Sequence, residues 1–161
     1  MMRLTTTETV EKYKDTLFRI AFHICRCEAD ADDAVQECFC KYHTVRMEYE
    51  SEEHLKAWLI RVTINFARNI ATSFWRRNRE GWEEYMAEMP FEEPGDSDVF
   101  EAVRTLPARY RLVIHLFYYE EYSVKEIAEI LETPVNTVKS RLSRGRKLLK
   151  KKLKEEWQDE Q

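Results

Sequence analysis

The chain has 161 residues, with 26 Lys and Arg against 30 Asp and Glu, four Cys, three Gly and four Pro. Hydrophobic residues make up 43% of it and aromatic residues 12%, which excludes disorder over most of its length. The longest apolar run, near Leu112–Phe117, is too short to span a bilayer, and the first residues lack the apolar core of a signal peptide. We therefore expect a soluble, cytoplasmic protein of one or two small domains, with no membrane insertion.

The net charge of −4 hides a strong pattern along the chain. Residues 1–79 hold 13 basic and 12 acidic side chains. Residues 80–98 hold no basic and 8 acidic side chains, and residues 99–161 hold 13 basic and 10 acidic ones. These segments therefore carry charges of +1, −8 and +3, which sum to the total. Within the last segment, Asn136–Lys154 holds nine basic residues and no acidic one. A basic surface is thus masked in the total by an acidic middle.

The acidic middle is predicted to be a linker. Four of the seven Gly and Pro residues lie between Asn78 and Ser97, and this stretch has no sustained apolar period. We predict two small domains, 1–79 and 99–161, joined by the flexible acidic linker 80–98. No convincing alternation with a period of two occurs in either half, so the predicted fold class is all-α.

Three helices are predicted in the N-terminal half from apolar residues at helical spacing. The first extends from Thr7 to about Ile24. The second extends from Asp30 to Val45, with acidic residues in its first turn, where the helix dipole favours them. The third begins after Ser51, which is a good N-cap residue, and continues to about Arg77.

Four helices are predicted in the C-terminal half. The first two cover Val99–Leu106 and Pro107 to about Tyr119, and the third follows Ser123, which forms a capping box with Glu126. The fourth follows a short turn that ends at Pro134. Its predicted buried stripe consists of Val135, Val138, Leu142, Gly145 and Leu149.

The last two of these helices and their short turn are typical of a helix-turn-helix, whose second helix enters a DNA major groove. If Val138 and Leu142 face inward, hydrogen-bonding and cationic side chains suited to base edges and phosphates face outward or lie on the flanks. This outward set is Asn136, Thr137, Lys139, Ser140, Ser143, Arg144 and Lys147. The alternative is a solvated basic face with no DNA partner. The capping box, the turn with Pro134 and the absence of acidic residues favour DNA.

These residues also resemble a known family. The segments Leu106–Ser123, Glu126–Leu131, Thr137–Leu142 and Arg144–Arg146 resemble the domain of extracytoplasmic-function (ECF) sigma factors that reads the minus-thirty-five element. In the N-terminal half, Asp30–Phe39 resembles the helix that binds the polymerase clamp, and Ala57–Asn65 resembles the helix that binds the minus-ten element. In the turn, Glu132 occupies a position where many relatives have Gly.

The resemblance implies a sigma factor that binds core RNA polymerase and promoter DNA, with an anti-sigma factor as a further partner. It implies minus-thirty-five contacts from the outward set together with Arg141, in a region 4 domain over 99–161. In a region 2 domain over 1–79, the loop Arg46–Glu53 and the third helix would capture the minus-ten strand and a flipped base. The residues implied in that capture are Arg61, Asn65, Arg68, Asn69 and Arg76.

The resemblance also implies that a polar face of the second helix docks on core polymerase. The residues of that face are Asp30, Asp33, Gln36 and Glu37. The alternative for them is a negative first turn that only balances the helix dipole. The acidic linker would either occupy the polymerase's RNA channel or serve as a solvated spacer.

The four cysteines, Cys25, Cys27, Cys38 and Cys40, form two Cys-x-Cys pairs. On a helix, residues i and i+2 point in nearly opposite directions, so each pair contributes one ligand to a shared site at best. We predict structural cysteines, no metal, no cofactor and no enzymatic activity, since no Gly-rich phosphate loop or nucleophile motif is present. The alternatives are a metal- or thiol-sensing switch, a helix-turn-helix regulator that acts without polymerase, and a helical adaptor that binds only protein.

For the aromatic residues of the third helix, the helical spacing favours packing in the core over base stacking. These residues are Trp58, Phe66, Phe74 and Trp75.

Overall fold

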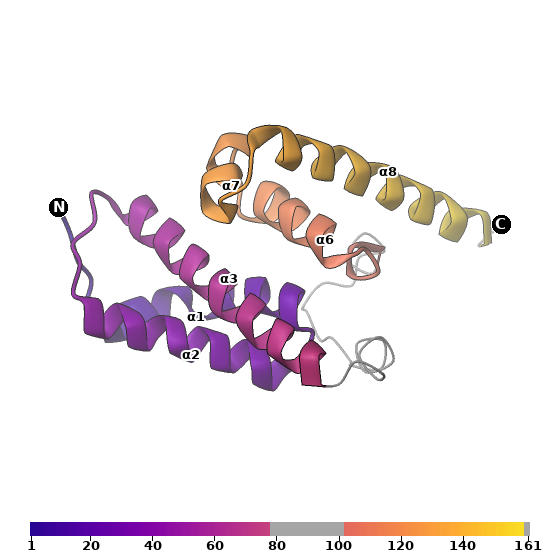
Figure 1. Cartoon of the computed structure of the whole chain (residues 1–161). Coiled ribbons are helices and arrows are strands. Elements are labelled where there is room, and N and C mark those ends of the chain that lie inside the picture. Colours follow the sequence, from indigo (N-terminus) through magenta and orange to yellow (C-terminus); the bar gives the residue numbers. More distant parts are fainter. Residues whose placement is uncertain (78–101, 160–161) are drawn as a thin grey trace. The chain divides into compact units, whose positions relative to one another are not determined.

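The structure of the chain, a computed structural model, describes the backbone of residues 1–77 and 102–159, and the side chains of 1–73 and 102–155. The chain divides into two compact units, Met1–Glu92 and Glu93–Gln161 (Figure 1). Within the described residues the regular structure is helical, and this confirms the all-α prediction. The one exception there is an isolated bridge between Met2 and Tyr49. The predicted linker 80–98 lies outside the described residues.

The first unit is a bundle of three helices, α1 (Thr6–Cys25), α2 (Glu28–Val45) and α3 (Glu52–Arg77), each packed against the other two (Figure 1). The prediction of these helices is confirmed, with α2 beginning two residues earlier than expected. A capping box at Thr5 starts α1, and left-handed residues, Arg26 and Arg46, end α1 and α2.

Large apolar side chains fill the centre of this bundle. Leu17 and Ile20 of α1 and Leu55 and Leu59 of α3 are fully buried. Each such side chain contributes roughly 1.5–3 kcal/mol through its burial, so the bundle has a core of its own.

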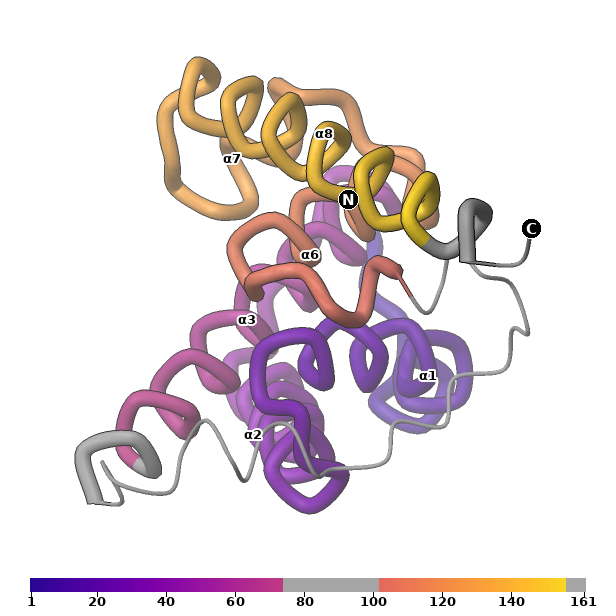
Figure 2. The backbone as a smooth tube through the Cα atoms, turned by 90° about the vertical axis from the view of Figure 1, so that its right-hand side faces the viewer, coloured from indigo at the N-terminus to yellow at the C-terminus, as the bar shows by residue number. Residues whose placement is uncertain are grey.

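The second unit contains α6 (Ala108–Ile114), the π-helix η1 (His115–Tyr119), α7 (Val124–Leu131) and α8 (Val135–Asp159). Figures 1 and 2 show α8 lying along α6, with α7 beside its N-terminal end. The close packing of α6 and α8 depends on Gly145. A Cβ atom added there would lie 2.7 Å from Cδ1 of Ile114.

The structure corrects two details of the second unit. The helix predicted to continue to Tyr119 widens into η1 after Ile114, which keeps His115 and Leu116 buried while Tyr119 reaches the surface. Ordinary helical periodicity does not indicate such a change of winding. Val135 is 38% exposed rather than part of the buried stripe, because the side chain at the very start of α8 precedes the turns that pack on the core.

The capping box that starts α7 and the short turn that follows this helix form as predicted. The Ser123 hydroxyl accepts a hydrogen bond from the amide of Glu126, and the Glu126 carboxylate accepts one from the amide of Ser123, both at 3.1 Å. Glu132 ends α7 in the left-handed conformation, with φ 52° and ψ 46°. This is the conformation for which helix ends select glycine.

Candidate nucleic-acid interface

The first half of α8 has one buried face and one exposed polar face. Val138 and Leu142 lie in the core, as predicted. Of the expected DNA-contacting residues, Thr137 and Arg141 are half-buried at the flanks of the helix. The remaining ones are exposed: Asn136, Lys139, Ser140, Ser143, Arg144 and Lys147. The core therefore fixes how this polar face is presented.

A cleft opens beside this face, with a volume of about 310 Å³. From α8 it is lined by Asn136, Thr137, Ser140, Arg141 and Arg144, and from α6 by Arg109 and Tyr110. The cleft brings together residues almost thirty positions apart in the sequence. All of its lining side chains carry hydrogen-bonding groups, and three of them are cationic.

Sequence reasoning missed Arg109 and Tyr110. One available indication was the position of Arg109 in the first turn of α6, where the helix dipole disfavours a cation. A cation at this unfavourable position indicates a role other than stabilising the helix. The position of Arg109 in the lining of the cleft is consistent with such a role.

Arg109 concentrates positive charge around Tyr110. Its Nη2 atom lies 3.4 Å from the Tyr110 hydroxyl, and its guanidinium carbon lies 4.6 Å from the centre of the ring. The hydrogen bond from Arg109 lowers the pKa of Tyr110, and Arg144 acts in the same direction. A site that stabilises a negative oxygen in this way is suited to binding an anion such as a DNA phosphate.

In the first unit, α3 carries the side chains expected to bind a single strand. Asn65, Arg68 and Asn69 are exposed, and Arg61 is half-buried. Asn65 and Asn69 are one helical turn apart, so they lie on one face. The side chain of Arg76 lies outside the described residues, as do those of Phe74 and Trp75.

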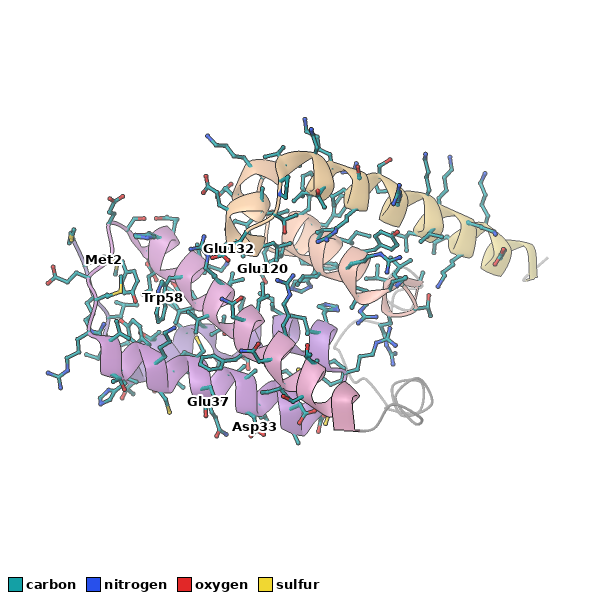
Figure 3. The ribbon with its side chains drawn as sticks, viewed as in Figure 1. Met2, Asp33, Glu37, Trp58, Glu120 and Glu132 are labelled. Carbon is teal, nitrogen blue, oxygen red and sulfur yellow. The ribbon has the colours of Figure 1, made fainter. Side chains whose placement is uncertain are left out.

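The loop Arg46–Ser51, which connects α2 to α3, is held by Tyr49. This side chain is 0% exposed and packs between Tyr42 and Trp58, with ring centres 6.1 Å and 5.7 Å away. Most of its neighbours in the loop expose their side chains. Trp58 and Phe66 are half-buried rather than fully in the core, and Figure 3 shows Trp58 near the start of α3.

The polar face expected to dock on polymerase lies on α2. Asp33, Gln36 and Glu37 are exposed, and Figure 3 shows Asp33 and Glu37 pointing away from the other two helices. Asp30 is half-buried, and its burial, with a smaller effect of the Asp33 carboxylate, raises its pKa. The face is therefore acidic and accessible over most of its area.

Three of the cysteines are buried, and Cys40 is exposed. The Cys25 and Cys38 thiols donate to the carbonyl oxygens of Ala67 and Leu59, at 3.6 and 3.4 Å. Burial raises the pKa of Cys25 to about 12 and that of Cys38 to about 11. Among the described residues, no three His, Cys, Asp or Glu side chains lie close enough together to hold a metal ion. In the same part of the chain, no helix is both long and apolar enough to cross a membrane.

Each of the two units matches a known protein family. The family "Sigma-70 region 2" matches residues 9–80, and the family "Sigma-70, region 4" matches residues 97–149. The sigma factor SigV of Bacillus subtilis is 32% identical over 151 residues, which covers 91% of this chain and 90% of that protein. The ECF sigma-E factor of Haemophilus influenzae is 31% identical over 143 residues, which covers 77% of this chain and 75% of that protein. The chain belongs to the ECF sigma factors of bacterial RNA polymerase.

The fold of this sigma factor also resembles a solved relative. The sigma factor RpoE of Bartonella quintana, crystallised with the anti-sigma factor NepR, superposes with a TM-score of 0.69 at 25% identity. The match covers 92% of this chain and 96% of that chain. Both units match families of sigma factors, so the comparisons do not favour a polymerase-independent regulator or a thiol-sensing switch.

Proposed function

We propose that this sigma factor divides promoter recognition between its two units. The C-terminal unit (99–161, region 4) reads minus-thirty-five duplex DNA, and the N-terminal unit (1–79, region 2) captures the minus-ten strand while docked on core RNA polymerase. The observation that carries the proposal is the cationic cleft of α6 and α8, beside an exposed polar helix face whose opposite side is core.

In the C-terminal unit, the exposed face of α8 enters the major groove. Asn136, Lys139 and Ser140 lie near the N-terminal end of the helix, where side chains reach base edges in this motif. Arg109 and Arg144 in the cleft bind backbone phosphates, and this fixes the register of the helix on the duplex. Because α8 is anchored by its buried face, its angle in the groove is set before DNA binds.

The salt dependence of duplex binding tests these phosphate contacts. On a minus-thirty-five duplex selected from a random pool by the holoenzyme, Arg144→Ala should weaken binding about equally for all sequences and reduce the salt slope by roughly one. Lys139→Ala should also weaken binding. Lys154→Ala is the matched control, since it removes the same charge about 15 Å farther along α8, beyond the Debye length. Unchanged slopes in the Arg144 and Lys139 variants would place this face away from DNA.

In the N-terminal unit, α3 and its preceding loop hold the melted strand. The amides of Asn65 and Asn69 bond the exposed edges of bases that have left the stack, and Arg61 and Arg68 bind phosphates. Arg76 is proposed for the same role from the family resemblance. Exposed amides on one face of a helix support this assignment, because each offers both a donor and an acceptor.

Promoter opening separates strand capture from duplex binding. Asn65→Ala should lower opening by about tenfold, the cost of one lost hydrogen bond to a base. Its affinity for the minus-thirty-five duplex should stay within about twofold, since that duplex is read by the other unit. Thr72→Ala, an exposed change on the same helix, is the control. An equal loss in both assays would argue against strand capture.

Asp30, Asp33, Gln36 and Glu37 form the proposed docking face for core polymerase in the cytoplasm. Charge reversal at the exposed Asp33 and Glu37 should abolish co-elution with core polymerase while leaving the helical content unchanged. Retained co-elution would contradict this role. An anti-sigma factor is proposed as a further partner, by analogy with the Bartonella quintana complex.

A further inference from the structure

A short N-terminal arm, Met2–Leu4, lies against the loop Arg46–Ser51. The amide of Met2 donates to the carbonyl of Tyr49 at 2.7 Å, and the amide of Tyr49 donates to the carbonyl of Met2 at 2.8 Å. This reciprocal pair is one rung of an antiparallel ladder. It joins the arm to the middle of the loop, across more than forty residues of sequence.

Arg3 extends this attachment to the end of α2. Its Nη2 atom donates to the carbonyl of Tyr42 at 2.7 Å, and its Nη1 atom donates to the carbonyl of Met47 at 2.9 Å. Its guanidinium carbon also lies 4.3 Å from the centre of the Tyr42 ring. The Tyr42 hydroxyl completes the arrangement by donating to the carbonyl of Leu4 at 2.6 Å. One guanidinium therefore bridges the last turn of α2 and the loop.

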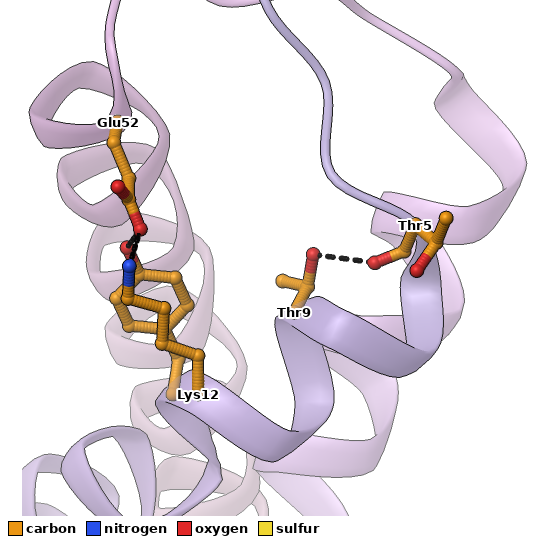
Figure 4. A network of polar contacts seen from close by, with 5 residues as sticks. Thr5, Thr9, Lys12 and Glu52 are labelled. Carbon is orange, nitrogen blue, oxygen red and sulfur yellow. Dashed lines mark hydrogen bonds and ion pairs between the residues drawn. The ribbon is translucent and has the colours of Figure 1, made fainter.

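The far end of the loop is fixed from α1. Glu52, the first residue of α3, pairs with Lys12 and accepts a hydrogen bond from the Tyr13 hydroxyl at 2.8 Å (Figure 4). The loop is thus held at its end by α1 and near its middle by the arm. Tyr49 is its single buried side chain, while Met47 and most of its neighbours face solvent.

We propose that Arg3 is a positioning residue for strand capture, acting through the loop Arg46–Ser51. This inference rests on the proposed function of α3 and the loop. Arg3 touches no DNA in this proposal. It fixes the backbone of the loop at Met47 and, through the arm, at Tyr49, so that the exposed side chains are ordered before the strand arrives. The arm lies outside the region 2 match, which begins at residue 9.

A bidentate charged contact to two backbone carbonyls is suited to this role. Arginine presents several N–H donors in a planar fork, so one side chain can hold two carbonyls at a fixed separation. A lysine keeps the charge near the end of α2, where the dipole favours it, but offers a point charge in place of the fork. Arg3→Ala and Arg3→Lys therefore separate the geometry from the charge.

Promoter opening by the reconstituted holoenzyme is the functional test. The probe is a promoter selected from a random library by wild-type holoenzyme, with 2-aminopurine in the minus-ten strand. Arg3→Ala should lower the opening equilibrium by about tenfold, and Arg3→Lys by a smaller factor. Affinity for a minus-thirty-five duplex should stay within about twofold. Lys14→Ala, which removes an exposed cation from α1, should open the promoter as wild type does.

Hydrogen exchange of the Tyr49 amide is the second readout, because this amide donates to the arm. Arg3→Ala should speed its exchange by about tenfold or more, while amides in the middle of α1 keep their protection. Unchanged protection of the Tyr49 amide would overturn the tether. Faster exchange with wild-type opening would overturn the positioning role. If wild-type holoenzyme captures no strand, the proposed function fails instead, and the exchange data still test the tether.

Discussion

The two units present their proposed nucleic-acid surfaces in different ways. In the C-terminal unit the surface is the outer side of α8, whose inner side supplies Val138 and Leu142 to the core. In the N-terminal unit part of the surface is the loop Arg46–Ser51, which has one buried side chain and is held near its middle by the N-terminal arm and at its end by α1. Core packing therefore fixes the position of the α8 surface directly, while polar contacts at the periphery fix the position of the loop.

The two units also differ in the charge of these surfaces. Asn136–Lys147, in the first half of α8, carries five basic residues and no acidic one, whereas residues 1–79 are nearly neutral. A duplex offers a regular array of phosphates to such a basic helix. Recognition of an unstacked base needs hydrogen bonds to its exposed edge in addition to phosphate contacts. Exposed amides on α3 and rigid support of the loop fit that second task.

The largest expected effect comes from removing a core side chain beneath the proposed duplex-reading surface. Leu142→Ala should lower the free energy of unfolding of the second unit by about 2–5 kcal/mol, because it leaves a cavity beneath α8. Duplex affinity should fall with it. Urea titration followed by the methyl resonances of Ile127 and Ile60, both fully buried, reports the two units separately.

Because each unit has its own core, the Ile60 transition should keep its midpoint. Leu148→Ala, at a 36% exposed position of the same helix, is the control and should cost less than about 0.5 kcal/mol. An equal shift of both methyl transitions in Leu142→Ala would show that the units unfold as one, and the contrast between them would fail.

Much of this architecture could be predicted from local sequence. The helices follow from apolar residues at helical spacing, and their ends follow from residues such as Ser51 and Ser123, whose caps act within one turn. The inward positions of Val138 and Leu142 follow from the same period. These features could be predicted because their physical causes lie within a few residues of each other.

The remaining features depend on contacts between distant segments. Arg109 and Tyr110 join the cleft only because α6 packs against α8 at Gly145. The bridge between Met2 and Tyr49 consists of a single pair, which leaves no periodic pattern in the sequence. No local rule indicates either arrangement, because each forms only when distant segments of the chain pack together.

Alkaline pH should lower the free energy of unfolding of the first unit more than that of the second. Burial raises the pKa of Cys25 to about 12 and of Cys38 to about 11, against about 8.5 for an exposed thiol. The unfolded chain therefore releases these protons first, so their contribution to stability is complete below about pH 8.5 and is lost as pH rises toward the folded values. At pH 10 the loss should be about 2 kcal/mol for each thiol.

In the second unit the direction is opposite at Tyr110. Its pKa is lowered by Arg109, so folding favours its ionised form and this contribution grows as pH rises toward 10. Urea titrations at pH 7.5 and pH 10 should therefore shift the Ile60 transition more than the Ile127 transition. Cys25→Ala should reduce the alkaline shift, and Cys40→Ser, at an exposed position, should not. A larger alkaline shift at Ile127 would contradict the assignment.

The smallest expected effect lies in the turn that sets the angle of α8. Glu132 holds a left-handed conformation that costs a non-glycine residue roughly 1 kcal/mol, and Figure 3 shows it at this turn (φ 52°). Glu132→Gly removes that cost but loses part of the gain to the greater entropy of the unfolded chain. The second unit should gain about 0.5 kcal/mol, measured by the Ile127 transition, with duplex affinity unchanged. Glu129→Gly, inside α7, should instead cost about 1 kcal/mol. If Glu132→Gly also destabilised the unit, the carboxylate side chain would contribute more to the turn than its backbone strain costs.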